Sequence, residues 1–113
     1  MEEADYDLYF DGYYFCGPYK RPKISAWHNV SGIYCVYACR YQAGETVPSR
    51  LLYVGQARKL RDRITRHEKR YQWLRSLNDG EALCYSVAAF PFFRRAHVEA
   101  AMIFEHQPPF NEH

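Results

Sequence analysis

Along this chain, short runs of β-forming residues alternate with stretches in which apolar residues recur at helical spacing. Residues 32–41 (GIYCVYACRY), 51–54 (LLYV) and 82–90 (ALCYSVAAF) are rich in β-branched and aromatic residues, and they predict three strands. The polar run Gln42–Arg50 contains a glycine and a proline, which predicts a turn or a long hairpin loop between two paired strands. The pattern therefore predicts a three-stranded, mainly antiparallel sheet.

Between and after these strands, apolar residues recur at the spacing of an α-helix. From Ala57 one face of a first helix is expected to be buried, because apolar residues recur at Leu60, Ile64 and either Tyr71 or Leu74. The order β-β-α-β-α predicts an α/β domain of layered, α+β type, in which helices flank the sheet. A second helix is expected over residues 92–106, where Pro108-Pro109 stops it, with apolar positions that include Ala96, Ala100, Ile103 and Phe104.

The N-terminal residues precede this pattern. Residues 6–16 (YDLYFDGYYFC) place Asp11-Gly12 between two aromatic-rich runs, which predicts either a β-hairpin or an extended flap packed on the core. Residues 17–23 (GPYKRPK) contain two prolines and are expected to form a loop. We therefore expect an N-terminal extension over residues 1–30, as a hairpin or cap, followed by one domain over residues 31–113.

The net charge of +2 conceals a strong asymmetry along the 113 residues. Residues 1–12 hold five acidic residues and no basic one, whereas residues 58–75 hold eight basic and two acidic ones, a local charge of +6. A concentrated positive field attracts polyanions, so the first predicted helix is a candidate nucleic-acid contact. The alternative is a solvated helix face.

The sequence carries no sign of export. It has no run of about 20 apolar residues and no secretory signal pattern, so we expect a cytoplasmic protein that is not bound to a membrane. Its four cysteines, Cys16, Cys35, Cys39 and Cys84, are then expected to be reduced. A zinc site made of Cys35, Cys39, Cys84 and a histidine is an alternative, although paired CxxC spacing is lacking.

Two short motifs and several later residues occur in an order that is similar to one known family. The residues that carry the likeness are Gly32-Ile33-Tyr34, Tyr53-Val54-Gly55, Arg63, His67, Glu99 and Asn111. Over residues 31–111 the chain resembles the GIY-YIG nucleases. The resemblance implies a GIY-YIG-like nuclease domain whose catalytic residues are Tyr34, Tyr53, Arg63, His67, Glu99 and Asn111.

The tyrosines of the two motifs lie on strands whose connection allows antiparallel pairing, so their hydroxyls can meet at one surface of the sheet. By resemblance, Tyr34 orients or deprotonates the attacking water, and Tyr53 assists or positions the phosphate. The alternative for both is an ordinary place in the core. Gly55 is expected to let the chain turn tightly towards the helix.

Arg63 and His67 are four residues apart and therefore share a helix face. The guanidinium of Arg63 is suited to the negative charge that develops on an attacked phosphodiester. His67, with an expected near-neutral pKa, holds a tyrosine hydroxyl or shuttles a proton, unless it is simply a surface histidine. Contacts to the nucleic-acid backbone are expected from Arg58, Lys59, Arg66 and Arg70.

Glu99 lies among apolar residues of the last helix, where a carboxylate needs a partner. By resemblance, it is the sole protein ligand of one divalent ion, Mg²⁺ or Mn²⁺, an ion commonly held by a carboxylate, waters and a phosphate. The alternative is an ion pair with Arg63 or Arg95. Asn111 is expected to pin the end of the chain beside the site, with a frayed terminus as the alternative.

The resemblance therefore implies a metal-dependent endonuclease that hydrolyses phosphodiester bonds in DNA, while RNA stays open as a substrate. Phosphate contacts do not read sequence, so low sequence specificity or structure-directed cutting is expected, and a homodimer or a partner protein is a further source of specificity. The alternatives are a non-catalytic nucleic-acid-binding module of the same fold and a protein-interaction domain with an acidic N-terminus.

Overall fold

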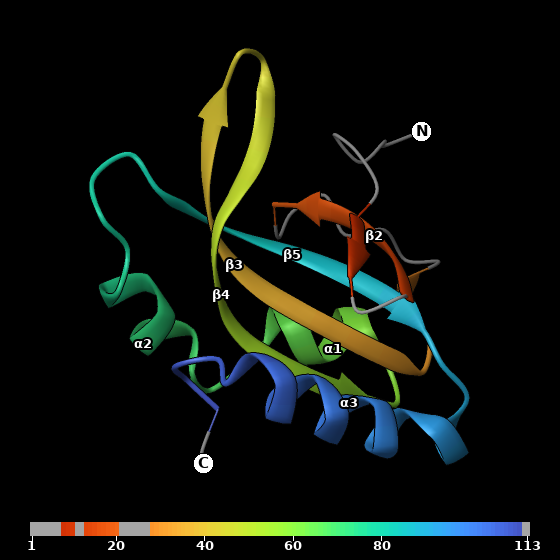
Figure 1. The fold of residues 1–113 in the computed structure, drawn as a ribbon. Coiled ribbons are helices and arrows are strands. Elements are labelled where there is room, and N and C mark those ends of the chain that lie inside the picture. The colour runs from red at the N-terminus through yellow and green to blue at the C-terminus, as the bar shows by residue number, and fades with distance from the viewer. Residues whose placement is uncertain (1–7, 11–12, 21–27, 112–113) are drawn as a thin grey trace.

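An antiparallel β-sheet with helices on both of its faces forms the centre of the molecule (Figure 1). The computed structural model describes residues 8–10, 13–20 and 28–111. Four strands form the sheet in the order β2-β5-β3-β4, and the short β1 extends it beside β2, with every neighbouring pair antiparallel. The α+β architecture and the antiparallel sheet are therefore confirmed. The elements are β1 (Leu8–Phe10), β2 (Tyr13–Tyr19), β3 (Gly32–Gln42), β4 (Glu45–Ala57), α1 (Leu60–Thr65), α2 (Arg70–Arg75), β5 (Ala82–Ala89) and α3 (Phe92–His106).

The sheet has more strands than the three that the sequence predicts, because β2 pairs with β5. The expected hairpin is present as β1 and β2, although its Asp11-Gly12 turn lies outside the described residues. The loop expected at residues 17–23 is wrong for its first part, since residues 17–19 belong to β2. Gly17 has a φ of +139° where the register with β5 shifts, a conformation that favours glycine. A Cβ at this position would also lie only 2.7 Å from the carbonyl oxygen of Tyr85.

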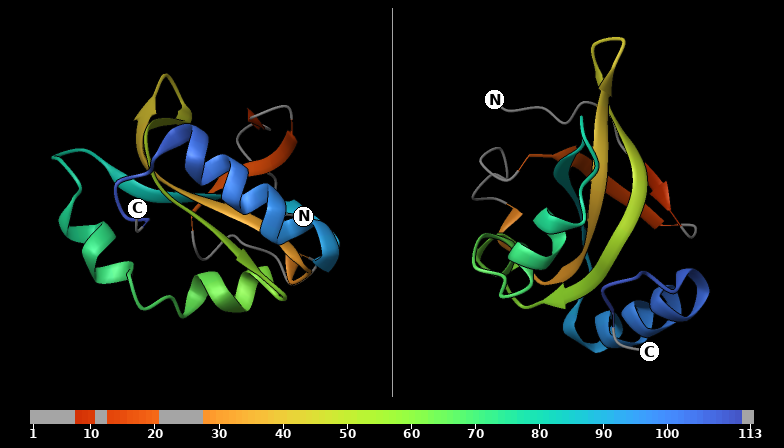
Figure 2. Two further views of the ribbon diagram at one scale, coloured as in Figure 1. Left: turned by 60° about the horizontal axis from the view of Figure 1, so that its bottom comes forward. Right: turned by 90° about the vertical axis from the view of Figure 1, so that its left-hand side faces the viewer.

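Side chains from alternate strand positions build a separate core on each face of the sheet. Figure 2 shows α1 and α2 on one side of the sheet and α3 on the other. We call these sides the α1–α2 face and the α3 face. Buried residues of the α1–α2 face include Tyr34, Val36, Leu60, Ile64, Trp73 and Tyr85. Buried residues of the α3 face include Phe15, Ile33, Cys35, Tyr37, Cys84, Val98 and Met102.

β3 and β4 form a long hairpin whose tip projects beyond the rest of the sheet (Figures 1 and 2). Of the two alternatives for Gln42–Arg50, the long loop is wrong, because both strands continue through the run and only a two-residue turn joins them. That turn has φ values of +51° at Ala43 and +81° at Gly44, the positive values that suit a tight hairpin. Pro48 is tolerated because β4 is an edge strand and its register with β3 shifts beside this residue.

The basic segment after β4 forms two short helices, where the sequence predicts one continuous helix from Ala57. A turn at His67 separates α1 from α2. The break changes which side chains are buried: Trp73 is fully buried, whereas Tyr71 is 76% exposed and Leu74 also lies at the surface. The expected burial of Tyr71 or Leu74 is therefore wrong.

α3 has the bounds that the sequence predicts, and it turns Val98 and Met102 towards the sheet. None of the described helices, α3 included, is long and apolar enough to span a membrane. Of the apolar positions marked in the sequence, Ile103 is partly buried against the α3 face, while Ala96, Ala100 and Phe104 are exposed.

Candidate active site

Tyr34 and Tyr53 bring their phenol rings together on the α1–α2 face of the sheet. The register of β3 and β4 pairs Tyr34 with Gly55 and Val36 with Tyr53, so the two tyrosines are diagonal neighbours across the strand pair. Their ring centroids lie 6.1 Å apart. Two residues that are distant in sequence thus meet at one surface of the sheet, as their strand positions predict.

Gly55 makes room for the ring of Tyr34. β4 continues through Gly55 to Ala57, so the tight turn expected at this glycine is wrong. A Cβ at Gly55 would overlap the phenol of Tyr34, which lies directly opposite on β3. The glycine of one motif is therefore explained by the packing of the tyrosine of the other.

The two phenols differ in their access to solvent. Tyr34 is 1% exposed, whereas Tyr53 is only partly buried. Burial, followed by the charge of Tyr53, raises the pKa of Tyr34 well above its usual range. Burial and then the Glu99 carboxylate raise the pKa of Tyr53, while Arg63 and a hydrogen bond from Tyr34 lower it. Tyr34 is thus a protonated donor at neutral pH, and Tyr53 is the phenol nearer the surface.

His67 lies among three aromatic rings, with its ring centroid 5.9 Å from that of Tyr34, 5.1 Å from Tyr53 and 4.5 Å from Trp73. Its side chain is fully buried. Burial, followed by the charge of Arg63, lowers the pKa of His67 to about 4. The near-neutral pKa expected from the sequence is therefore wrong, and the imidazole is neutral at pH 7.

The hydrogen bonding of His67 fixes the position of its proton. Nδ1 accepts a hydrogen bond from the backbone N–H of Lys69 at 3.1 Å, so the neutral ring carries its proton on Nε2. Within the part of the chain that the structure describes, the buried Nε2 has no hydrogen-bond partner. An unpaired buried donor costs about 1–3 kcal/mol. This N–H is therefore a buried donor beside the phenols whose acceptor the described residues do not supply.

Arg63 is held by a carboxylate that the sequence did not single out. Its Nη1 and Nη2 donate to Oε1 and Oε2 of Glu68 at 2.8 and 2.9 Å, and this pairing lowers the pKa of Glu68 to about 2. Glu68 lies five residues after Arg63, a spacing that does not pair side chains on one continuous helix. The break after α1 brings them together. Because a guanidinium has five N–H donors, three remain for another anion.

Glu99 of α3 is connected to β4 by an amide. Its Oε1 accepts a hydrogen bond from Nε2 of Gln56 at 3.0 Å, and Oε1 of Gln56 accepts one from Nε of Arg95 at 3.1 Å. Gln56 stands between Glu99 and Arg95, and Arg63 is paired with Glu68. Among the described residues, neither ion pair considered for Glu99 therefore forms directly.

The environment of Glu99 suits a cation. Burial raises its pKa, and among the described residues its carboxylate bonds the neutral amide of Gln56 rather than a cation. Its charge also raises the pKa of both Tyr53 and Tyr34, after the larger effect of burial, so the carboxylate lies within electrostatic reach of both phenols. A single carboxylate completed by waters and a phosphate is a common way to hold Mg²⁺. The donor set fits that ion.

Within residues 8–10, 13–20 and 28–111, no group of three or more histidine, cysteine, aspartate or glutamate side chains is arranged to hold a metal ion. The zinc alternative for Cys35, Cys39 and Cys84 therefore finds no site in this part of the chain. All three cysteines are buried and free of disulfides.

Asn111 fastens the end of the described chain to β4. Its side-chain Oδ1 accepts a hydrogen bond from Val54 N, and its Nδ2 donates to Val54 O, both at 2.9 Å. The backbone N–H of Phe110 donates to Leu52 O at 3.1 Å. Asn111 is 8% exposed. It thus pins the tail beside Tyr53 as expected, and it does so by bonding the backbone of the strand.

Basic residues line an open hollow at the start of α1. The hollow has a volume of about 550 Å³ and is lined by Arg58, Lys59, Arg63 and Arg66, together with Gln56, Ala57 and Asp62. Three of the four expected backbone contacts therefore share one concave surface with Arg63. Gln56 belongs to the same surface and also bonds Glu99.

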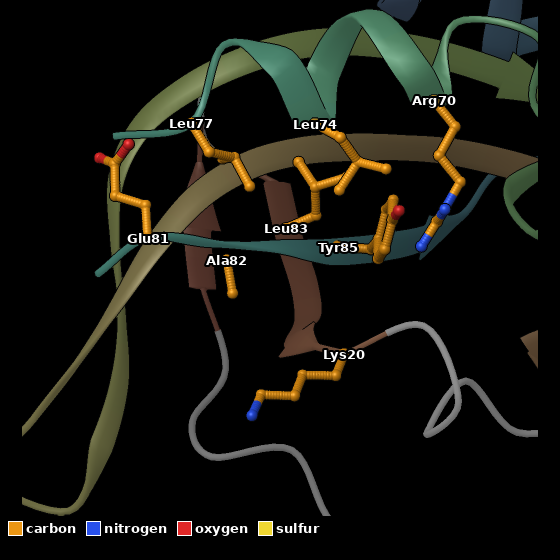
Figure 3. A pocket seen from close by; sticks show the side chains of 8 residues that line it. All are labelled: Lys20, Arg70, Leu74, Leu77, Glu81, Ala82, Leu83 and Tyr85. Carbon is orange, nitrogen blue, oxygen red and sulfur yellow. The ribbon is translucent and has the colours of Figure 1, made fainter. Parts of the chain in front are cut away.

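Arg70 belongs to a different surface. It lines a second hollow of about 380 Å³ with Lys20, three leucines and the ring of Tyr85, below α2 (Figure 3). The structure therefore does not bring Arg70 together with Arg58, Lys59 and Arg66. The two hollows do not share a lining residue.

Four residues of the site were not identified from the sequence: Gln56, Glu68, Lys69 and Trp73. Lys69 places its ammonium 5.5 Å from the ring centroid of Tyr53 and donates to the carbonyl oxygen of Phe110 at 3.0 Å. Trp73 stacks on both His67 and Tyr53. The position of Gln56 directly after the second motif is the one sequence signal that could have identified any of the four.

Comparison with models of known protein families, with curated proteins and with solved structures finds no match to this chain. The function proposed below is therefore supported by the residues of this chain alone.

Proposed function

We propose that this chain is a GIY-YIG-type endonuclease that hydrolyses phosphodiester bonds in DNA with the help of one divalent ion. The observation that carries the proposal is the convergence of Tyr34, Tyr53, His67, Arg63 and Glu99 beside a basic hollow. A core of purely structural tyrosines has no need of an unpaired imidazole N–H or of a carboxylate without a direct cation partner.

The burial of the two tyrosines supports roles that differ from those expected from the sequence, where Tyr34 acts on the attacking water and Tyr53 assists. Tyr53 is the phenol nearer the surface, so it contacts the attacking water or the phosphate. Tyr34 holds Tyr53 in place by packing its ring against it, with the two ring centroids 6.1 Å apart. With a raised pKa, Tyr53 acts by orientation and by passing on a proton, since very little phenolate exists at neutral pH.

His67 and Arg63 supply donors for the negative charge of the transition state. The Nε2–H of the neutral His67 is oriented by the Lys69 backbone and donates to a phosphate oxygen or to the water. Arg63 offers its three remaining N–H groups while Glu68 holds the guanidinium in position. Both groups are fixed before substrate binds, so little reorganisation is needed.

Glu99 would hold the divalent ion, and Gln56 would orient its carboxylate. When bound, such an ion supplies Lewis acidity at a phosphate oxygen. Arg58, Lys59 and Arg66 contact phosphates along the hollow. Because such contacts carry no base information, we expect low sequence specificity or a preference for branched DNA structures.

A nicking assay tests the proposal. The purified chain is incubated with supercoiled, branched and single-stranded DNA, and with RNA, in Mg²⁺ and in a chelator. We expect Mg²⁺-dependent cleavage, and a loss of at least about 100-fold in Arg63→Ala and in Glu99→Ala, the size typical for one transition-state contact.

Matched controls on the same protein are Arg61→Ala, an exposed arginine of α1, and Glu45→Ala, an exposed carboxylate at the tip of the β3–β4 hairpin. Both should cleave at nearly the normal rate. Normal nicking by either Arg63→Ala or Glu99→Ala, with the fold intact by circular dichroism, would refute the mechanism.

A non-catalytic nucleic-acid-binding module is the second candidate. It is favoured by one observation, the bidentate pairing of Arg63 with Glu68, which partly occupies the guanidinium. This reading predicts steeply salt-dependent DNA binding without cleavage under any metal condition.

A further inference from the structure

α3 carries a stripe of apolar side chains on the side that faces away from the sheet. Phe93 and Phe104 are 72% and 77% exposed, and Ala100 is exposed between them. His97 lies in the same stripe. Spacings of four, three and four residues place these four side chains along one line of the helix. Figures 1 and 2 show α3 at the outside of the molecule, with its outer side free of other described elements.

Two opposite charges flank this stripe. Arg94 and Glu105 follow Phe93 and Phe104 by one residue each, and both are exposed. Phe93 and Phe104 are eleven residues apart, and so are Arg94 and Glu105, which corresponds to about three helical turns or about 16 Å. Arg94 and Glu105 therefore lie on the same flank of the stripe, near its two ends. Single exposed phenylalanines are common, but two in line with a charge at each end form a defined surface.

We propose that this outer face of α3 is the interface of a symmetric homodimer in which α3 packs antiparallel against α3 of a second copy. A twofold axis perpendicular to the helix, level with its midpoint, sets Phe93 of one copy beside Phe104 of the other. Ala100 lies near the axis, where a small side chain lets the two helices approach.

The same axis pairs the charges. It places Arg94 of one copy beside Glu105 of the second copy on the same flank, and the reverse pair at the other end of the interface. In a parallel arrangement, the charged flank of one copy would lie on one side of the helix pair and that of the second copy on the other side. Arg94 and Glu105 would then have no partner across the interface. The charge pattern therefore selects a second copy in antiparallel orientation as the occupant of this face.

The expected dimer is weak. A helix of 15 residues is about 22 Å long, so one helix pair buries less than the ~800 Å² per partner of a standard interface. We expect dissociation in the micromolar range, roughly −8 kcal/mol. Glu99 faces β4 and Gln56, away from the stripe, so the dimer and the proposed nuclease site are independent of each other.

Sedimentation velocity of the purified full chain over roughly 1–300 μM tests this proposal. We expect a shift from the 13.5 kDa monomer towards twice that mass as the concentration rises. Phe93→Glu should raise the dimer dissociation constant at least tenfold. The matched control is Tyr41→Glu, which changes an equally exposed aromatic (73%) on the β3–β4 hairpin and should leave the constant within twofold.

A charge exchange tests the orientation. Arg94→Glu should weaken the dimer about fivefold, and Arg94→Glu combined with Glu105→Arg should restore it. Because Arg94 and Glu105 are exposed, their variants test the proposed dimer even if Phe93→Glu fails to fold. A wild-type chain that stays monomeric throughout the range would overturn the proposal. Equal weakening by Phe93→Glu and Tyr41→Glu, or a double exchange weaker than Arg94→Glu alone, would overturn it too.

Discussion

On the α3 face of the sheet, the hydroxyl of Tyr37 bonds the hydroxyl of Ser86 at 3.1 Å, and both side chains are buried. On the α1–α2 face, the buried Nε2 of His67 and Nε1 of Trp73 have no partner among the described residues. Both faces are closely packed with apolar side chains. The difference lies in their polar groups, which are paired on one face and partly unpaired on the other.

Under the proposed function, this difference separates a core that only stabilises from a core that also carries a site. Leaving a buried donor unpaired costs about 1–3 kcal/mol, so a fold rarely leaves one without a partner from water, an ion or a ligand. The α1–α2 face does so beside two phenols and a basic hollow. On the α3 face, the phenol of Tyr37 is paired with the hydroxyl of Ser86.

The largest expected effect concerns His67 and pH. Its pKa is about 4 in the folded chain and 6.5 in its ordinary state, so between these values the unfolded chain binds the extra proton. The free energy of unfolding should therefore fall as the pH drops from 6.5 to 4, by up to about 3 kcal/mol. Urea unfolding at a series of pH values measures it.

His67→Phe is the control for this pH dependence, because it keeps a ring against Tyr34, Tyr53 and Trp73 and removes the titrating group. The slope between pH 6.5 and 4 should then shrink. His28, whose pKa burial also lowers, contributes the same amount to both proteins. Identical slopes for wild type and His67→Phe would show that His67 is not buried as a neutral ring.

The next effect contrasts a phenol on each face. Tyr53→Phe should reduce the cleavage rate about 100-fold with little loss of stability, because in the proposed mechanism its hydroxyl acts on substrate. Tyr37→Phe should leave the rate unchanged and cost about 1 kcal/mol of stability, because it removes the bond to Ser86. Nicking rates and urea unfolding of both variants test the contrast, and a reversed result would assign the site to the α3 face.

The smallest expected effect concerns the space that Gly55 leaves for Tyr34. Gly55→Ala should destabilise the fold by about 2 kcal/mol through overpacking. In a Tyr34→Ala background the same change should cost far less, since the ring is gone. The double-mutant cycle measures this coupling by urea unfolding. An equal cost in both backgrounds would mean that the glycine serves another purpose.

The long central elements could be predicted from the sequence because their patterns are strong. The strand predicted at residues 32–41 and the helix predicted at residues 92–106 agree closely with β3 and α3. Two segments with proline were predicted as loops over residues that belong to strands, namely residues 17–19 of β2 and the residues of β4 around Pro48. Pro18 and Pro48 sit where the strand register shifts, and such positions can accept proline without loss of the strand.

Only those features of the site that depend on the spacing of residues within one strand or helix could be predicted from the sequence. The strand positions of Tyr34 and Tyr53 predict their meeting. The pKa of His67 depends on burial by rings from three other elements, which no local pattern reveals. Glu68 escaped notice because its pairing with Arg63 requires the helix to break.

β4 lies at the margin of the sheet, where exposed backbone groups invite an extended strand from another molecule. The amide of Asn111 occupies both the N–H and the carbonyl of Val54, and Phe110 occupies the carbonyl of Leu52. The tail therefore seals this margin along the stretch that bears Tyr53. A residue expected only to steady the site thus also guards the molecule against edge-to-edge aggregation.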